Sequence, residues 1–219
     1  ASMVTLVVFV AMDIRIFPEL KRYSSTLALF RSLFAFGGWV TVSGVVGPIL
    51  VYLDRFLIGS ILTMSAVAYY TAPYEAVTRL WVIPSSMTMA LFPAFSTLEG
   101  IKDRTKLGML FARSIKYVLL MLGPMVVVIA LFARDVLQIW LGSDFAGEST
   151  LAMQILAIGV LVNSIAHVPF ALLQGTGRPD IPAKFHMIEL PVYLCIAWIM
   201  VSSFGIAGAA GAWAFRVSM

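Results

Sequence analysis

Residues 149–177 read STLAMQILAIGVLVNSIAHVPFALLQGTG, a run of 29 residues between Glu148 and Arg178 without any Asp, Glu, Lys or Arg. A helix needs about 20 mostly apolar residues to cross a bilayer, because the hydrocarbon core is about 30 Å thick. This run is long enough to cross a membrane as one helix. It predicts a chain whose solvent is lipid.

The composition agrees with this interpretation. Of the 219 residues, 61% are hydrophobic and only 12% are charged, whereas a soluble domain has about 45–50% apolar and about 25% charged residues. These values exclude a soluble globular domain, a disordered chain, collagen and a disulfide scaffold. One cysteine and two histidines leave too few ligands for a dedicated zinc site, and we expect neither a metal nor another cofactor.

Further stretches without charged residues predict more helices. Turn and loop signals divide the chain into expected helices over 32–59, 67–97, 114–133, 150–174, 185–203 and from 206 onward. The last boundary rests on residues 202–205, Ser-Ser-Phe-Gly, a short break between two apolar runs that are together too long for one helix. The expected fold class is an all-α integral membrane protein with five complete transmembrane helices and two partial ones.

The basic residues alternate between the two sides of these helices. Eleven of them lie in the segments 13–31, 98–116 and 175–184, whereas the connections between those segments hold only Arg134. Lysine and arginine are enriched in cytoplasmic loops, so the three basic segments are predicted to be cytoplasmic and 134–148 to lie outside. The pI of about 9.4 therefore reflects membrane topology, and no nucleic-acid partner is expected.

Three arginines remain, and each lies inside an expected span. Arg79 lies roughly 18 Å and Arg216 roughly 15 Å from the outer ends of their helices, at 1.5 Å per residue. Arg55 is nearer the outer end. Charged groups near the middle of a membrane face a bundle interior or a wet cavity and usually mark a transport path. We therefore expect Arg79 and Arg216 to line one water-filled cavity.

Each arginine also has a structural interpretation. Arg55 follows Asp54 and can extend to the membrane interface. Arg79 lies four residues after Glu75, in the order that favours an ion pair within one helix. Arg216 has no acid within four residues in either direction, which favours an anionic ligand. The candidate site residues are therefore Arg79, Arg216, Arg55, Glu75 and Asp54.

Other polar residues and motifs have simpler interpretations. His167, Gln154 and Asn163 favour packing between helices, and His186 and Glu189 are expected near the cytoplasmic interface. The prolines at 73, 84 and 93 predict a bent helix over 67–97. The sequence has no Walker A motif, no Gly-x-Ser-x-Gly motif and no cluster of paired carboxylates, so no enzyme activity is expected.

Four runs, taken in order and with their spacing, are similar to one known family. They are VYLDRFLIG at 51–59, YYTAPYE at 69–75 followed by RLW at 79–81, LFPAFS at 91–96, and ALLQGTGRPD at 171–180. Over roughly residues 30–215 the chain resembles bacterial polysaccharide-repeat flippases, the O-antigen and exopolysaccharide exporters of the multidrug/oligosaccharidyl-lipid/polysaccharide exporter superfamily. Members of this family are multi-helix transporters built from two helical bundles.

The resemblance implies both an organisation and a function. Residues 1–31 would be the end of a preceding helix and a cytoplasmic linker, and 32–219 would be most of the second bundle of a transporter of which about half is missing. The implied activity moves an undecaprenyl-diphosphate-linked oligosaccharide repeat across the bacterial inner membrane by alternating access. The implied partners are this lipid-linked oligosaccharide diphosphate, membrane lipids, and H⁺ or Na⁺ as the coupling ion.

Other functions remain as alternatives. Within the same superfamily these are a multidrug or cation antiporter and a peptidoglycan-precursor flippase. A cation antiporter should place acids in its cavity, and here only Glu75 is deep. A membrane glycosyltransferase or polymerase fits less well, because it needs a catalytic base and a large outer loop, and the longest outer loop has about 15 residues.

Overall fold

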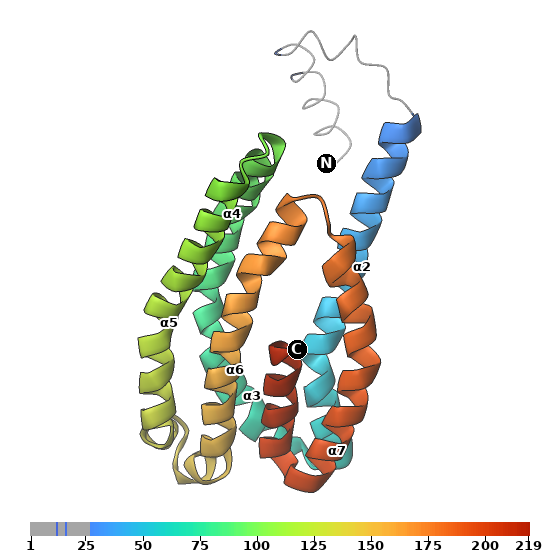
Figure 1. Ribbon diagram of the computed structural model, residues 1–219. Helices are drawn as coiled ribbons and strands as arrows, with labels where there is room; N and C mark the ends of the chain where they lie inside the picture. The colour runs from blue at the N-terminus through green and yellow to red at the C-terminus, as the bar shows by residue number, and fades with distance from the viewer. Residues whose placement is uncertain (1–11, 13–15, 17–26) are drawn as a thin grey trace. The chain divides into compact units, whose positions relative to one another are not determined.

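The computed structural model describes Met12, Ile16 and residues 27–219, and the secondary structure of this part is helical throughout (Figure 1). The chain divides into two units, residues 1–38 and 39–219, and all five candidate site residues lie in the second unit. Of the helix end and linker expected in residues 1–31, residues 1–26 lie outside the described residues, apart from Met12 and Ile16, and residues 27–31 are the start of helix α2 rather than a linker.

Six α-helices and one 3₁₀ turn follow one another along the described chain, and each expected range except 67–97 lies within one α-helix, apart from the final residue 219. They are α2 (Leu27–Ile61), α3 (Met64–Thr78), η2 (Arg79–Trp81), α4 (Val82–Gly100), α5 (Arg104–Leu141), α6 (Ser143–Gly175) and α7 (Asp180–Ser218). Four segments are long and apolar enough to cross a membrane, namely 36–61, 104–141, 143–175 and 180–218. The chain is a multi-pass membrane protein. The count of five complete spans stays a prediction.

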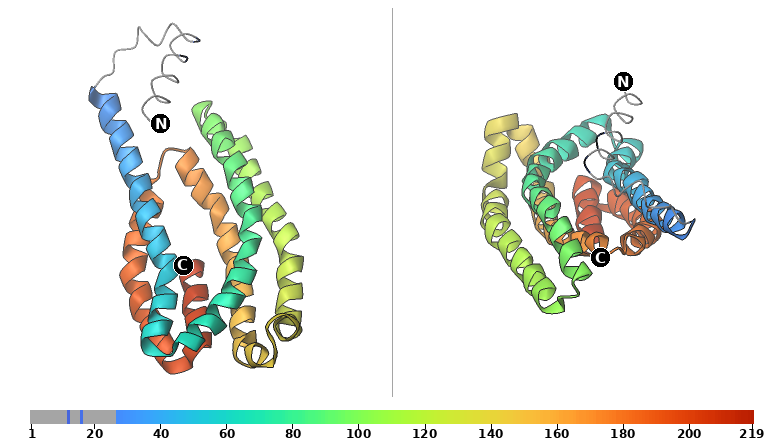
Figure 2. Two further views of the ribbon diagram at one scale, coloured as in Figure 1. Left: turned by 180° about the vertical axis from the view of Figure 1, so that it is seen from behind. Right: turned by 90° about the horizontal axis from the view of Figure 1, so that it is seen from above.

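The expected helix over 67–97 is interrupted rather than continuous. The 3₁₀ turn η2 separates α3 from α4, and Figure 2 shows the change of direction between the two helices. Pro84 lies in the first turn of α4, where its missing N–H removes no helical hydrogen bond. Arg79 is the first residue of η2 and so lies at the bend itself.

Helix α7 contains the break that the sequence predicts near residues 202–205. Gly205 has φ 57° and ψ −134°, a conformation that side chains strongly disfavour. The segment after it turns back along the first part of α7 (Figure 1). A Cβ at Gly208 would overlap the carbonyl group of Met200, so the two limbs approach closely only because this residue is glycine.

Helix α6 is the central element of the second unit and packs against α3, α4, α5 and α7. Two of its glycines permit these contacts. A Cβ at Gly159 would lie 2.5 Å from Cζ3 of Trp213 on α7, and one at Gly175 would lie 2.9 Å from Cβ of Phe95 on α4. Helix α2 packs on α7, where Leu50 is buried with Tyr193 and neighbouring apolar residues. The result is a close-packed bundle that fixes the helices carrying the arginines.

The connections α4–α5 and α6–α7 share one geometry and lie at the same end of the second unit (Figures 1 and 2). Each closes its helix with a residue of positive φ, 55° at Lys102 and 76° at Gly177, and with the two reversed hydrogen bonds of a Schellman motif. Asp103 then caps α5, and the backbone N–H of Lys106 lowers the pKa of its carboxyl group. The short turns at 62–63, 142 and 205 lie at the opposite end. Successive connections therefore alternate between the two ends of the second unit, as the predicted topology requires.

Candidate functional site in the helix interior

Asp54 ties α2 to α3 by a buried hydrogen bond. Its side chain is 0% exposed, its carboxylate accepts from the hydroxyl of Tyr70, and it also accepts from the backbone N–H of Arg55 at 2.9 Å. A buried carboxylate is costly unless hydrogen bonds replace its water. Because Asp54 accepts from Arg55 on its own helix α2 and from Tyr70 on α3, its geometry is that of a buried anchor between two helices.

Arg55 and Glu75 form an ion pair between α2 and α3. Arg55 Nη2 lies 2.8 Å from Glu75 Oε1, and Arg55 Nη1 donates to the carbonyl of Val51 at 3.2 Å. The guanidinium carbon lies 4.4 Å from the centre of the Tyr74 ring. The Arg55 side chain is only 14% exposed, so it does not extend to the interface. Glu75 binds Arg55, and the Glu75–Arg79 pair that the sequence allowed is not formed.

Arg79 lines a cavity of about 320 Å³ together with that ion pair. It is exposed, and among residues 27–219 it has no ion-pair partner. The other residues lining this cavity are Val51, Tyr52, Arg55, Tyr74, Glu75, Thr78 and Trp81. The cavity therefore presents two cations and one acid, beside aromatic walls from α2, α3 and η2.

Arg216 lies in a different cavity, of about 400 Å³, between α6 and α7. The side chain is 8% exposed, and its Nε makes no hydrogen bond within the described part of the chain. Glu189 Oε1 lies 3.8 Å from that Nε, a distance that suits an ion pair and exceeds a hydrogen bond. The guanidinium carbon lies 5.0 Å from the ring centre of Tyr193. Arg79 and Arg216 thus line two cavities rather than one.

Sequence reasoning missed the roles of Glu189 and His186. Glu189 Oε2 lies 3.0 Å from Nδ1 of His186, one turn earlier on α7, while Oε1 faces Arg216. The spacing of three residues predicts the first contact. No local pattern predicts the second, because Arg216 reaches Glu189 only through the reversal of α7 at Gly205.

An aromatic cluster connects the wall of the first cavity, lined by Tyr74 and Trp81, with Trp213 on α7, three residues before Arg216. The Tyr74 ring centre lies 5.6 Å from that of Trp213 and 6.3 Å from that of Trp81. The hydroxyl of Tyr74 and the indole N–H groups of Trp81 and Trp213 are buried without a hydrogen-bond partner in the described part of the chain. Together with Arg216 they form a region rich in hydrogen-bond donors. Buried donors of this kind suit an acceptor such as a phosphate or a sugar hydroxyl.

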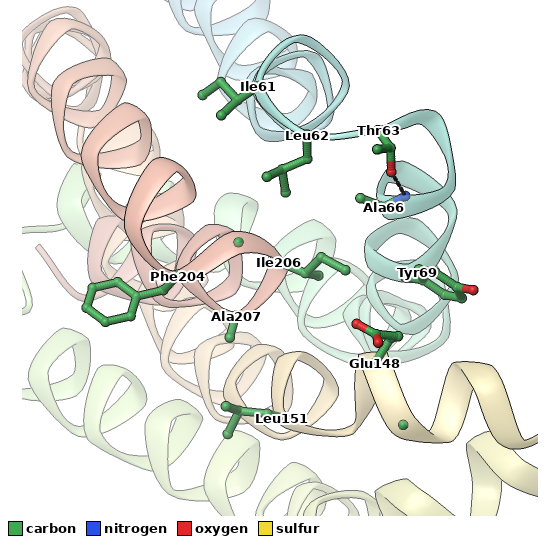
Figure 3. Close-up of a pocket in the computed structure, with 12 residues that line it drawn as sticks. Ile61, Leu62, Thr63, Ala66, Tyr69, Glu148, Leu151, Phe204, Ile206 and Ala207 are labelled. Carbon is green, nitrogen blue, oxygen red and sulfur yellow. Dashed lines mark hydrogen bonds between the residues drawn. The ribbon is translucent and has the colours of Figure 1, made fainter.

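A larger cavity, of about 750 Å³, lies elsewhere, around the break in α7. Figure 3 shows its walls from the α2–α3 turn, α3, the start of α6 and the region of Gly205, with Tyr69 and Glu148 as polar groups. No candidate arginine lines it. Within residues 27–219, no group of three or more His, Cys, Asp or Glu side chains could hold a metal ion.

Comparisons with known proteins agree with this architecture. A family described as polysaccharide biosynthesis protein matches residues 1–150. A putative O-antigen transporter of Shigella flexneri is 35% identical over 192 residues, which cover 86% of this chain and 44% of that protein. A probable low-salt glycan biosynthesis flippase of Haloferax volcanii, Agl15, is 27% identical over 189 residues, covering 86% of this chain and 40% of that protein.

A solved structure shows the same fold. It is the outward-facing conformation of a multidrug resistance MATE family transporter of the MOP superfamily, with a TM-score of 0.76 and 18% identity. The match covers 97% of this chain and 50% of that one. The chain thus spans about half of the solved transporter and 44% of the Shigella flexneri relative. Because this family matches residues 1–150, more than half of the chain, the chain belongs to the polysaccharide biosynthesis protein family.

Proposed function

We propose that this chain is part of a flippase that moves an undecaprenyl-diphosphate-linked oligosaccharide repeat across the bacterial inner membrane by alternating access. Relatives named as an O-antigen transporter, a glycan biosynthesis flippase and the lipopolysaccharide biosynthesis protein WzxC support this assignment. The lipid tail remains in the membrane, the diphosphate binds the arginines, and the sugar follows through the cavity. An H⁺ or Na⁺ gradient supplies the free energy.

Arg216 is the observation that carries the proposal. An arginine that is 8% exposed, inside a membrane helix and without a hydrogen bond from Nε, needs an anion to compensate its charge fully. Its planar fork suits the paired oxygens of a phosphate. Arg55 and Arg79 provide further cations in the neighbouring cavity, which Tyr74 and Trp81 of the aromatic cluster line.

We further propose that the chain performs no bond chemistry. Translocation breaks no covalent bond, and binding, orientation and a change of access are sufficient for it. The acids beside the candidate arginines serve other purposes, since Asp54 accepts from Tyr70, Glu75 binds Arg55, and Glu189 faces Arg216 and His186. At these two cavities the pairing of acids with partners disfavours a cation antiporter, which would direct free carboxylates toward its substrate.

An export assay on Arg216 variants tests the proposal. In cells that depend on the protein for polysaccharide export, Arg216→Gln should abolish or strongly reduce export. A charged hydrogen bond to phosphate contributes about 1.5–3 kcal/mol, so binding should weaken roughly 10- to 150-fold. Arg216→Lys should restore export partly, because it keeps the charge and loses the planar fork.

The matched control is Arg134→Gln, which removes an exposed arginine near the C-terminal end of α5, outside both arginine-lined cavities. Protein amounts in the membrane are measured for every variant, so that loss of protein is distinguished from loss of function. Wild-type export by Arg216→Gln at normal protein levels would contradict the role of this arginine.

A further inference from the structure

In the cavity between α6 and α7, the acidic side chain of Glu189 lies where it can compete with a bound anion for Arg216. We propose that the Glu189 carboxylate occupies the place of the phosphate beside Arg216 when no substrate is bound, and that it withdraws to His186 when a lipid diphosphate enters. Glu189 would thereby weaken substrate binding enough to allow release. This inference rests on the proposed function, because it assumes that the anion at Arg216 is a lipid diphosphate.

The geometry of the two carboxylate oxygens supports this exchange. Oε2 is already held by His186 Nδ1 at 3.0 Å, whereas Oε1 lies 3.8 Å from Arg216 Nε. The contact with Arg216 is therefore an ion pair without a hydrogen bond, and it is the weaker of the two. A phosphate oxygen at hydrogen-bonding distance from Nε would bind Arg216 better than Glu189 does. Glu189 keeps the hydrogen bond to His186 when it leaves.

Charge balance explains why a competitor is present. The side chains of Arg216 and Glu189 are 8% and 11% exposed, and a buried cation with no counter-charge is strongly destabilising. Glu189 compensates the charge in the empty state. After an anion has bound, Glu189 becomes a like charge beside the phosphate and repels it. The same carboxylate therefore stabilises the empty cavity and lowers the affinity of the filled one.

The walls of the cavity suit a lipid diphosphate. Pro169, Phe170, Leu173 and Phe185 form an apolar surface, and the polar groups are Asn163, His186, Glu189 and Arg216. A few polar groups in an otherwise apolar cavity fix the orientation of an amphiphilic ligand. An isoprenoid chain fits the apolar part, with its diphosphate at Arg216.

His186 keeps Glu189 in place during the exchange. Its Nδ1 lies 3.0 Å from Glu189 Oε2, so this contact remains when Oε1 moves away from Arg216. Arg216 also lies near Tyr193 on α7, Asp54 on α2 and Tyr74 on α3.

Binding of farnesyl diphosphate to the purified protein in detergent tests the inference, with farnesol as the probe that lacks phosphate. Glu189→Gln should bind farnesyl diphosphate more tightly than wild type, by roughly 5- to 150-fold, the range of typical site-to-site couplings. Binding of farnesol should not change. Glu99→Gln is the matched control, since it removes an acid paired with exposed Arg104 outside this cavity. Export by Glu189→Gln should be slower although binding is tighter.

Equal or weaker binding of farnesyl diphosphate by folded Glu189→Gln would overturn the role of Glu189.

Arg216→Gln separates this inference from the proposed function. If Arg216→Gln binds the probe as well as wild type does and exports normally, the proposed anion site is wrong. If Arg216→Gln loses binding but Glu189→Gln gains none, the anion site is retained and only the competitor is refuted.

Discussion

Replacing Tyr70 with phenylalanine should destabilise the protein through Asp54. The hydroxyl of Tyr70 donates to the carboxylate of Asp54, and both side chains are 0% exposed. In Tyr70→Phe the carboxylate keeps only the backbone N–H of Arg55 as a hydrogen-bond donor in the described part of the chain. No water replaces the lost hydroxyl in a position this closely packed. The free energy of unfolding should therefore fall.

The magnitude follows from the burial of this pair. A hydrogen bond to a charged group contributes about 1.5–3 kcal/mol, and full burial removes the screening that reduces such values at the surface. The unfolding equilibrium constant should therefore rise roughly 10- to 150-fold. Asp54→Asn should cost less, because the amide oxygen still accepts from Tyr70 and no buried charge remains.

Reversible unfolding of the purified protein in mixed micelles measures this difference. Tyr69→Phe is the matched control, because it removes the same atom from the neighbouring residue. The Tyr69 side chain is partly exposed, and its hydroxyl makes no hydrogen bond within the described residues. Tyr70→Phe should be destabilised well beyond Tyr69→Phe. Equal stability of the two variants would show that the Asp54–Tyr70 contact contributes nothing, and the argument from burial would fail.

Two further predictions concern topology and packing. In a cysteine-free background, a membrane-impermeant thiol reagent added from outside should label Ser143→Cys and spare Thr105→Cys, because positively charged loops stay in the cytoplasm; the reverse pattern would invert the topology. Gly159→Ala should lower the stability by about 1–3 kcal/mol in the same unfolding assay, because its methyl group meets Trp213 at 2.5 Å. Gly123→Ala, where a Cβ would meet nothing within 4 Å, should not be destabilised.

The helices could be predicted from sequence because the membrane imposes a simple rule on them. Every backbone group in the hydrocarbon region must be bonded internally, so long apolar runs have to be helical. The break at Gly205 was also predictable, and so was a bend somewhere in residues 67–97, which contain three prolines. The position of the bend at Arg79 was not, because it depends on packing between α3, α4 and α6.

The candidate site was predictable only in part, because its partners come from different helices. Sequence spacing favoured an ion pair between Glu75 and Arg79. In the structure Glu75 pairs instead with Arg55, 20 positions away. The distance between Arg216 and Glu189 depends on the path of α7 after Gly205. Spacing rules apply within one helix, and contacts between helices follow from packing that a single sequence does not reveal.

The runs that carry the family resemblance contact one another in pairs. Asp54 of the first run accepts from Tyr70 of the second. Gly175 of the fourth run lies against the side chain of Phe95 and the backbone of Phe92 and Ser96 in the third. The first and second runs therefore form one contact between helices, and the third and fourth runs form another. A change on one side of such a contact disturbs the other side, which gives a physical reason for both runs of a pair to resemble the family together.

Because α7 reverses at Gly205, the number of residues after this glycine sets the position of Arg216. Arg216 follows Gly205 by 11 residues, about three turns at 3.6 residues per turn, so it lies on the face that runs alongside the first limb. Small residues, Gly208 and Ala212, occupy the earlier turns of that face. One residue inserted between Gly205 and Arg216 would rotate the guanidinium by about 100° and lengthen its reach by about 1.5 Å. Function should therefore tolerate substitutions at the exposed positions of this segment far better than any change in its length.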